Sequence, residues 1–281
     1  MPWQLLVAIS VFTFSISVLL RRLLLSQDKS DPVAYVILFQ GLVGLLTGVY
    51  AVMHGFHAPD FNRYWFPIVV TILLYAAAHI VSTKAFQVIE ASIFSVLFAT
   101  SAIWTMIGGF ILFHDHLALK EVVGVLLVFC SVGILVEQKG VLKINKDILL
   151  GLFTGMLFGV ATVGWAYVGK HADAASWTAL SFIGPSLTVL IIRPRSVLKM
   201  KSFLHGNIFT RMLLLAIVFS ISSLTSLLAY TRGNVSLVGV LQQTGIIVTT
   251  ILAVLFLRER TNLLRKAMAT VICFVAVLLI V

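Results

Sequence analysis

Ten long apolar stretches, separated by short polar breaks, run along the chain from one end to the other. They cover approximately residues 3–25, 33–53, 65–87, 91–113, 118–137, 147–169, 176–192, 208–231, 235–257 and 263–281. A helix that crosses a bilayer needs about 20 mostly apolar residues, and each stretch is close to that length. The pattern therefore predicts an all-α integral membrane protein with ten transmembrane helices.

Two of the polar breaks are so short that they indicate tight helical hairpins. One lies around Val88-Ile89-Glu90 and the other around Arg232-Gly233-Asn234, and a shift of 144 residues places Glu90 on Asn234. This repeat divides the chain into two similar five-helix halves, residues 1–140 and 141–281. Because five is an odd number, the second half must enter the membrane from the opposite side, as in transporters with inverted-topology repeats.

The composition places the whole chain in lipid. Hydrophobic residues make up 60% of it and charged residues 11%, against about 25% charged in an average soluble domain. The net charge of +10 would suit a nucleic-acid binder, but such a protein needs a basic face on a soluble fold. We therefore expect the partners to be the lipid bilayer and a small-molecule solute, with no nucleic acid, for a protein that is a monomer or a homodimer.

Lys and Arg are distributed unequally between the two sides of the predicted bundle. The poor side holds Arg63, Lys120, Lys170 and Arg232. The rich side holds the remaining sixteen of the twenty, including Arg21 and Lys266. Loops rich in Lys and Arg usually face the cytoplasm. We therefore expect a multi-pass protein of the cell membrane, inner or plasma, with both termini outside.

The two halves carry related motifs near their ends. The second half has Ala229-Tyr230-Thr231 followed by Phe256-Leu257-Arg258-Glu259-Arg260, and the first has Ala85-Phe86-Gln87 followed by Phe113-His114-Asp115-His116. In these motifs, and in Lys120-Glu121-Val122-Val123-Gly124 at the start of the fifth helix, the chain resembles the EamA-type ten-helix family of the drug/metabolite transporter superfamily. The resemblance implies a secondary transporter or facilitator that works by alternating access and exports an amino acid or related metabolite. It also implies cytoplasmic termini, the opposite of what the loop charges favour.

All ten acidic residues lie at or near the ends of the predicted spans. A buried ionisable group is a candidate functional residue because burying it in lipid is costly, and no carboxylate is placed for that role. Coupling to protons or sodium through a mid-membrane carboxylate is therefore not expected.

The rival function is an intramembrane lipid-modifying enzyme. It would need paired carboxylates with a metal, or an activated nucleophile, and His114-Asp115-His116 lacks the further ligands that a metal site requires. We expect no catalytic residues, no cofactor and no metal. A flippase of a lipid-linked sugar or phospholipid stays open as an alternative within transport.

The third and eighth spans carry matching polar stripes. On the third span, Tyr75, His79 and Ser82 share one helix face by their spacing. The repeat places Phe219, Ser223, Ser226 and Tyr230 on the corresponding face of the eighth span. If the two spans face one another across a pseudo-two-fold axis, these stripes line a central cavity. Alternatively, His79 hydrogen-bonds a neighbouring helix and the serines allow close packing.

Three further side chains complete the candidate site. Gln242 lies in the first third of the ninth span, and Trp104 and Trp165 lie away from the span ends where membrane tryptophans usually gather. Aromatic walls with a few polar groups are typical of small-molecule pockets. The alternatives are an interhelical hydrogen bond for Gln242 and lipid contact for the tryptophans. The predicted substrate-binding residues are Tyr75, His79, Ser82, Trp104, Trp165, Ser223, Ser226, Tyr230 and Gln242.

Overall fold

The computed structural model describes residues 1–26, 31–113, 119–138, 141–142, 145–232, 238, 241–242, 244–258 and 262–280. These residues are almost entirely helical. Six of the described helices are long and apolar enough to cross a membrane. They are α1 (Trp3–Ser26), α2 (Pro32–Met53), α3 (Phe61–Val88), α7 (Lys146–Gly169), α8 (Ala174–Ile192) and α10 (Gly206–Arg232). The prediction of an all-α, multi-pass membrane protein is confirmed.

The other described helices are shorter. They are α4 (Ala91–Phe98), α5 (Ser101–Phe113), α6 (Leu119–Val136), α12 (Gly245–Phe256) and α13 (Leu263–Ile280), with the single turns α9 (Ser196–Lys199) and η1 (Met200–Phe203) after α8. The strands β1 (Glu137–Gln138) and β2 (Val141–Leu142), which the sequence did not predict, form a small antiparallel hairpin. Described helices lie in each of the ten predicted apolar stretches, and α4 and α5 share the fourth.

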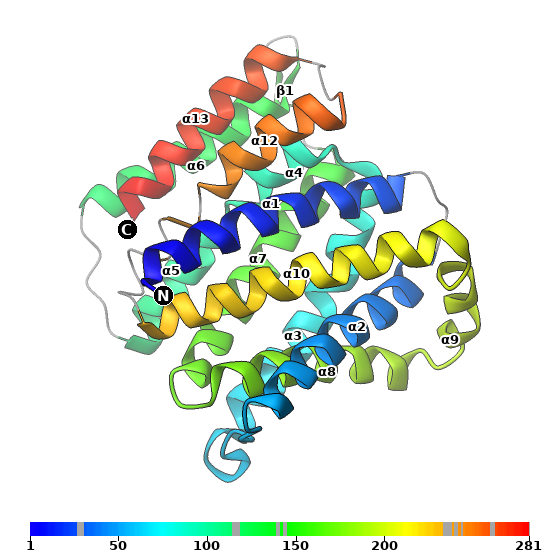
Figure 1. Ribbon diagram of the computed structural model, residues 1–281. Coiled ribbons are helices and arrows are strands. Elements are labelled where there is room, and N and C mark those ends of the chain that lie inside the picture. The colour runs from blue at the N-terminus through cyan, green and yellow to red at the C-terminus, as the bar shows by residue number, and fades with distance from the viewer. Residues whose placement is uncertain are drawn as a thin grey trace.

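The helices pack mainly with partners far away in the sequence. In Figure 1, α1 lies beside α10, and α13 lies beside α6. In the same way, α2 packs on α8, and α3 packs on α7. The helix pairs α5 with α7 and α12 with α1 are also packed together, less extensively than these four pairs. The marked N- and C-termini lie towards the same end of the helices (Figure 1).

Glycines on one face of α7 allow the broken fourth stretch to approach closely. Gly151, Gly155 and Gly159 are spaced four residues apart and share a helix face. Gly155 lies against the break between α4 and α5, close to the carbonyl oxygen of Leu97, and Gly159 lies against the carbonyl oxygen of Ser101. The absence of a Cβ atom at these positions lets two helix backbones come together, as in other membrane helix pairs.

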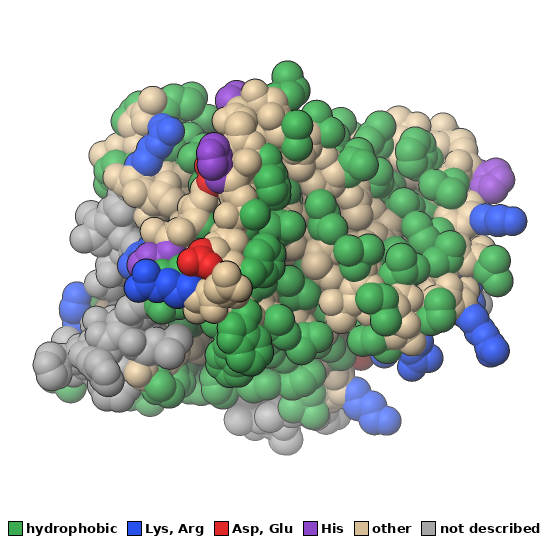
Figure 2. Space-filling view, turned by 90° about the horizontal axis from the view of Figure 1, so that it is seen from below, with side chains coloured by type: hydrophobic (Ala, Val, Ile, Leu, Met, Phe, Trp, Pro, Cys, Tyr) green, Lys and Arg blue, Asp and Glu red, His purple; other side chains and the backbone are tan. Residues whose placement is uncertain are grey.

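The outer surface matches a bilayer environment. Large hydrophobic side chains such as Leu45, Phe66, Ile191 and Leu214 are exposed along the spans. Figure 2 shows hydrophobic side chains over the middle of one face, while Lys and Arg side chains gather towards its two ends. This distribution is the one that a lipid belt between two aqueous surfaces requires.

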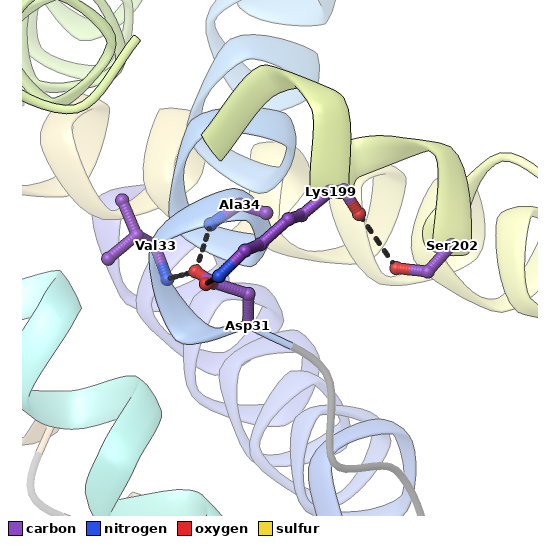
Figure 3. Close-up of polar contacts among 5 residues, drawn as sticks. All are labelled: Asp31, Val33, Ala34, Lys199 and Ser202. Atoms are coloured by element: carbon purple, nitrogen blue, oxygen red, sulfur yellow. Dashed lines mark hydrogen bonds and ion pairs between the residues drawn. The ribbon is translucent and has the colours of Figure 1, made fainter. Parts of the chain in front are cut away.

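The start of α2 is fixed by Asp31, which caps its first turn (Figure 3). Its carboxylate accepts hydrogen bonds from the backbone N–H groups of Val33, at 2.9 Å, and Ala34, at 3.1 Å. Nζ of Lys199 on α9 lies 2.6 Å from Oδ2 of Asp31. Burial by itself raises the pKa of Asp31, but the hydrogen bonds from Lys199, Ala34 and Val33 together outweigh it and hold this pKa below its ordinary value.

Replacing Gly159 by alanine should lower the free energy of unfolding by about 1 to 3 kcal/mol, the usual cost of overpacking. An added Cβ atom would lie 2.5 Å from the carbonyl oxygen of Ser101 and 2.6 Å from Cβ of Trp104. Unfolding of the purified variants in detergent measures the loss. Gly133→Ala is the matched control, because a Cβ atom there meets nothing within 4 Å and alanine favours the helix. Equal stability of the two variants would contradict this packing.

Replacing Asp31 by asparagine should destabilise the protein at neutral pH and make no difference in strong acid. Asparagine keeps a capping oxygen and removes only the charge. Because the folded pKa of Asp31 lies below the ordinary value of 3.8, the carboxylate stabilises the folded chain above pH 3.8, and this contribution is lost as the pH falls through the folded pKa. Thermal unfolding of both proteins between neutral and acid pH measures it. A difference in Tm that is independent of pH would refute this role.

Candidate functional site

The two predicted stripes lie on the inner faces of α3 and α10. His79 and Ser82 of α3 are buried, whereas Tyr75, Ser223 and Tyr230 are half-buried. Tyr75 and Tyr230 are close enough to interact electrostatically, and the Tyr75 hydroxyl also interacts with Thr162 of α7. The stripes therefore approach one another at their Tyr75 and Tyr230 ends.

His79 lies among aromatic rings that come from four helices. Its ring centroid is 4.9 Å from that of Phe158 on α7, in an edge-to-face arrangement. The rings of Tyr75, Phe39 on α2 and Phe182 on α8 follow at 6.1, 6.3 and 6.4 Å. The imidazole makes no hydrogen bond to any described residue. The alternative interpretation of His79 was a hydrogen bond to a neighbouring helix, and the described residues do not contain such a bond.

These rings belong to a larger set at the centre of the molecule, which we call the central aromatic cluster. It consists of Phe14, Phe39, Tyr75, His79, Phe86, Phe94, Phe98, Phe158, Phe182 and Phe219, linked ring to ring. Seven helices contribute to it, from both halves of the sequence. Aromatic pairs of this kind add attraction beyond simple burial of area, and they exclude water from whatever polar group they enclose.

Arg21 is the polar group that the cluster encloses. Its guanidinium carbon lies 4.8 Å from the ring centroid of Phe39, 5.2 Å from that of Phe86 and 5.3 Å from that of Phe219. Nη1 donates a long hydrogen bond of 3.5 Å to Oγ of Ser82. The residue is 6% exposed. The loop-charge count includes Arg21 on the basic side, and in the structure its side chain turns inward onto the rings.

The sequence contains a pattern from which the inward position of Arg21 could have been predicted. Three leucines, Leu23 to Leu25, follow it before the polar break, so the residue lies inside the apolar stretch rather than beyond it. Counting back by helical spacing places Phe14, Ser17 and Arg21 on one face of α1. Phe14 itself belongs to the central aromatic cluster. A basic residue on the inward face of a span is a functional candidate by its cost alone.

Gln242 joins α1 to α10 rather than reaching the central aromatic cluster. Its Nε2 donates hydrogen bonds to Oγ of Ser226, at 3.0 Å, and to Oγ of Ser10, at 3.2 Å. Ser10 in turn donates to the carbonyl oxygen of Ser222 at 3.1 Å. Two predicted residues, Ser226 and Gln242, are therefore brought together. The contacts match the alternative interpretation of Gln242 as an interhelical link.

The two tryptophans take part in helix packing. Nε1 of Trp165 donates to Oγ of Ser181 at 3.1 Å, and Nε1 of Trp177 donates to the carbonyl oxygen of Trp165 at 2.9 Å. Trp165 packs with Trp177 in a hydrophobic group against which Tyr75 and Tyr230 also pack. Trp104 is half-buried where α5 meets α7. Neither side chain lies fully exposed towards lipid, and neither is among the rings around Arg21.

A second basic residue is also buried. Lys266 at the start of α13 is 3% exposed and forms an ion pair with Glu90, the residue that precedes α4. The loop-charge count places Lys266 with the loop after the ninth apolar stretch, and in the structure its side chain is buried. This pair and the pair of Lys199 with Asp31 both join the first half of the sequence to the second.

Some buried polar groups were not singled out from the sequence. Both amide atoms of Gln40 and the hydroxyl groups of Tyr35 and Thr71 make no hydrogen bond within the described part of the chain. Gln40 could have been noticed as a lone amide inside an apolar stretch. His114-Asp115-His116 lies outside the described residues. Among the residues that are described, no three His, Cys, Asp or Glu side chains are grouped to hold a metal ion.

Comparisons with known proteins agree with this architecture. Twenty-four chains of solved structures resemble the protein. One of them, described as "Crystal structure of protein", has a TM-score of 0.67 and 16% identity, with 96% of each chain covered. At that identity the likeness shows the fold alone. No curated protein matches the chain. The profile of the EamA-like transporter family matches residues 1–136. In residues 1–136, this multi-pass membrane protein therefore carries the sequence pattern of the EamA-like transporter family, which is part of the drug/metabolite transporter superfamily.

Proposed function

We propose that the protein is a secondary transporter or facilitator that moves a small organic solute across the cell membrane by alternating access. The family supports transport as the general activity. By the resemblance found in the sequence motifs, the leading solute is an amino acid or related metabolite, and the leading direction is export. The candidate binding residues remain Tyr75, His79, Ser82, Trp104, Trp165, Ser223, Ser226, Tyr230 and Gln242, to which Arg21 is added.

The pairing of helices supports two inverted halves, residues 1–140 and 141–281. In the two halves, α1 corresponds to α7, and α3 corresponds to α10. Exchanging these counterparts turns the pair of α1 with α10 into the pair of α7 with α3, and both pairs are closely packed. Likewise, α5 with α7 becomes α12 with α1. The pairs α2 with α8 and α6 with α13 map onto themselves. A pseudo-two-fold axis through the bundle accounts for all of these contacts.

The same contacts suggest which helices move together. Each closely packed set mixes the two halves: the α1 group consists of α1, α10 and α12, and the α7 group consists of α7, α3 and α5. Arg21 and Phe219 belong to the α1 group, whereas His79, Ser82 and Phe158 belong to the α7 group. The central aromatic cluster thus lies at the boundary between the two groups, and this observation carries the proposal. A solute bound at such a boundary can be exposed to one side or the other as the groups rock.

Replacing His79 and Gln242 together by alanine should reduce transport at least tenfold without loss of folded protein. The change removes the central imidazole and the amide that links α1 to α10. Proteoliposomes loaded with the amino acid that most raises the Tm of the wild type provide the measurement. The matched control is His205→Ala with Thr244→Ala, because within the described part of the chain both side chains bond to nearby carbonyl groups. Unchanged transport in the first variant would remove both residues from the site.

A further inference from the structure

The guanidinium group of Arg21 has hydrogen-bonding capacity that the described chain does not use. Among the described residues, Nε and Nη2 are buried without a hydrogen bond of ordinary geometry, although the Tyr35 hydroxyl is close enough to interact, and the bond from Nη1 to Ser82 is at the limit of hydrogen-bond length. A guanidinium group carries five N–H donors in one plane. Buried polar groups in proteins are nearly always satisfied, so the unpaired edge of Arg21 needs an explanation.

The rings around Arg21 do not supply one. Phe39, Phe86 and Phe219 offer their π-electrons to the cation, but they accept none of the hydrogen bonds that its N–H groups can donate. The charge also has no counter-ion among the described residues. The ion pairs among the described residues are Lys199 with Asp31 and Lys266 with Glu90, and neither includes Arg21. His79 is close enough to interact with Arg21 electrostatically, and it adds no negative charge.

Arg22, the next residue, shows that the inward position of Arg21 is specific. Its Nη1 donates to the carbonyl oxygen of Phe86 at 2.5 Å, near the end of α3, where a helix has carbonyl groups to spare. A long basic side chain near a span end usually extends to the interface. Arg21 instead points between the α1 group and the α7 group, with the hydroxyl of Ser82 beside it and that of Tyr35 close enough to interact.

We infer that Arg21 recognises an anionic group of the transported solute, a carboxylate or a phosphate, an inference that rests on the proposed transport function. Two oxygen atoms of such a group match the paired N–H donors of a guanidinium edge. The surrounding rings keep water away, which strengthens the charge-assisted hydrogen bonds. The phosphate of a lipid head group shares this chemistry with the phosphate of a soluble metabolite.

Binding to the purified full-length protein tests the inference without depending on transport. Succinate and glycerol 3-phosphate are the soluble anionic probes, with succinamide and glycerol as their uncharged counterparts. Phosphatidic acid, compared with diacylglycerol, is the lipid probe. Thermal unfolding is recorded for the wild type, Arg21→Gln and Arg21→Lys. The matched control is Arg211→Gln, which removes the same charge at an exposed position of α10.

At least one soluble anion should raise the Tm of the wild type, and its uncharged counterpart should not. In Arg21→Gln the dissociation constant of that anion should rise more than about tenfold, because a buried charge-assisted contact is lost. Arg21→Lys should retain part of the affinity, because it keeps the charge but not the paired donors. Arg211→Gln should behave like the wild type. A response to phosphatidic acid alone, lost in Arg21→Gln, would assign the site to a lipid head group.

Two results would overturn the inference: no response of the wild type to any anionic probe, or a response that survives unchanged in Arg21→Gln. Without probes, Arg21→Gln should be at least as stable as the wild type, because it removes a buried charge that has no counter-ion among the described residues. If Arg21→Gln fails to fold, Arg21→Lys is compared with the wild type instead. An affinity of Arg21→Lys for the anion that equals that of the wild type would then refute the inference. If the protein transports a neutral solute and Arg21→Gln transports it equally well, anion recognition is refuted but the transport function stands. If the protein binds an anion and transports nothing, the transport function is refuted but anion recognition stands.

Discussion

Inside a bilayer no water is available to satisfy polar groups, so each one on a span must find its partner within the protein. Many of the described hydroxyl groups do so on their own helix. Thr13 donates to the carbonyl oxygen of Ile9, Thr47 to that of Val43 and Thr154 to that of Leu150. Such residues need no functional explanation. The constraint singles out the buried groups that the helices leave unsatisfied, and Arg21 carries the largest cost among them.

Close packing and this polar centre depend on each other. The glycines of α7 bring α4 and α5 near enough for Phe98 to reach Phe158. The same approach closes the ring of aromatic side chains around His79 and Arg21. A buried charge without a counter-ion does nothing for stability, and hydrophobic replacements of buried charges are often stabilising. Its place at the boundary between the α1 group and the α7 group is therefore better explained by binding than by folding.

That position also connects recognition to movement. A ligand shifts a conformational equilibrium only as far as its affinity differs between the two states. Arg21 belongs to α1, whereas Ser82 and Phe86 belong to α3, so the guanidinium lies between the two sets of helices. In the proposed alternating access, movement of one set against the other would change the contacts of Arg21 directly. The two ion pairs between the sequence halves lie outside this centre, and they tie loop and helix ends together.

The periodicity and length of the apolar stretches determined the helices, because spanning helices are dictated by local hydrophobicity. They also placed Tyr75, His79 and Ser82 on one inner face, since helical spacing is a local property. The grouping of Ser226 with Gln242, the use of Trp165 in packing and the burial of Arg21 and Lys266 were decided only by the tertiary structure. Loop-charge counting treats every basic residue near a span end as solvated. Whether a long side chain extends to water or turns inward depends on what lies beside it, and for Arg21 that is a set of rings contributed by α2, α3 and α10, far apart in the sequence.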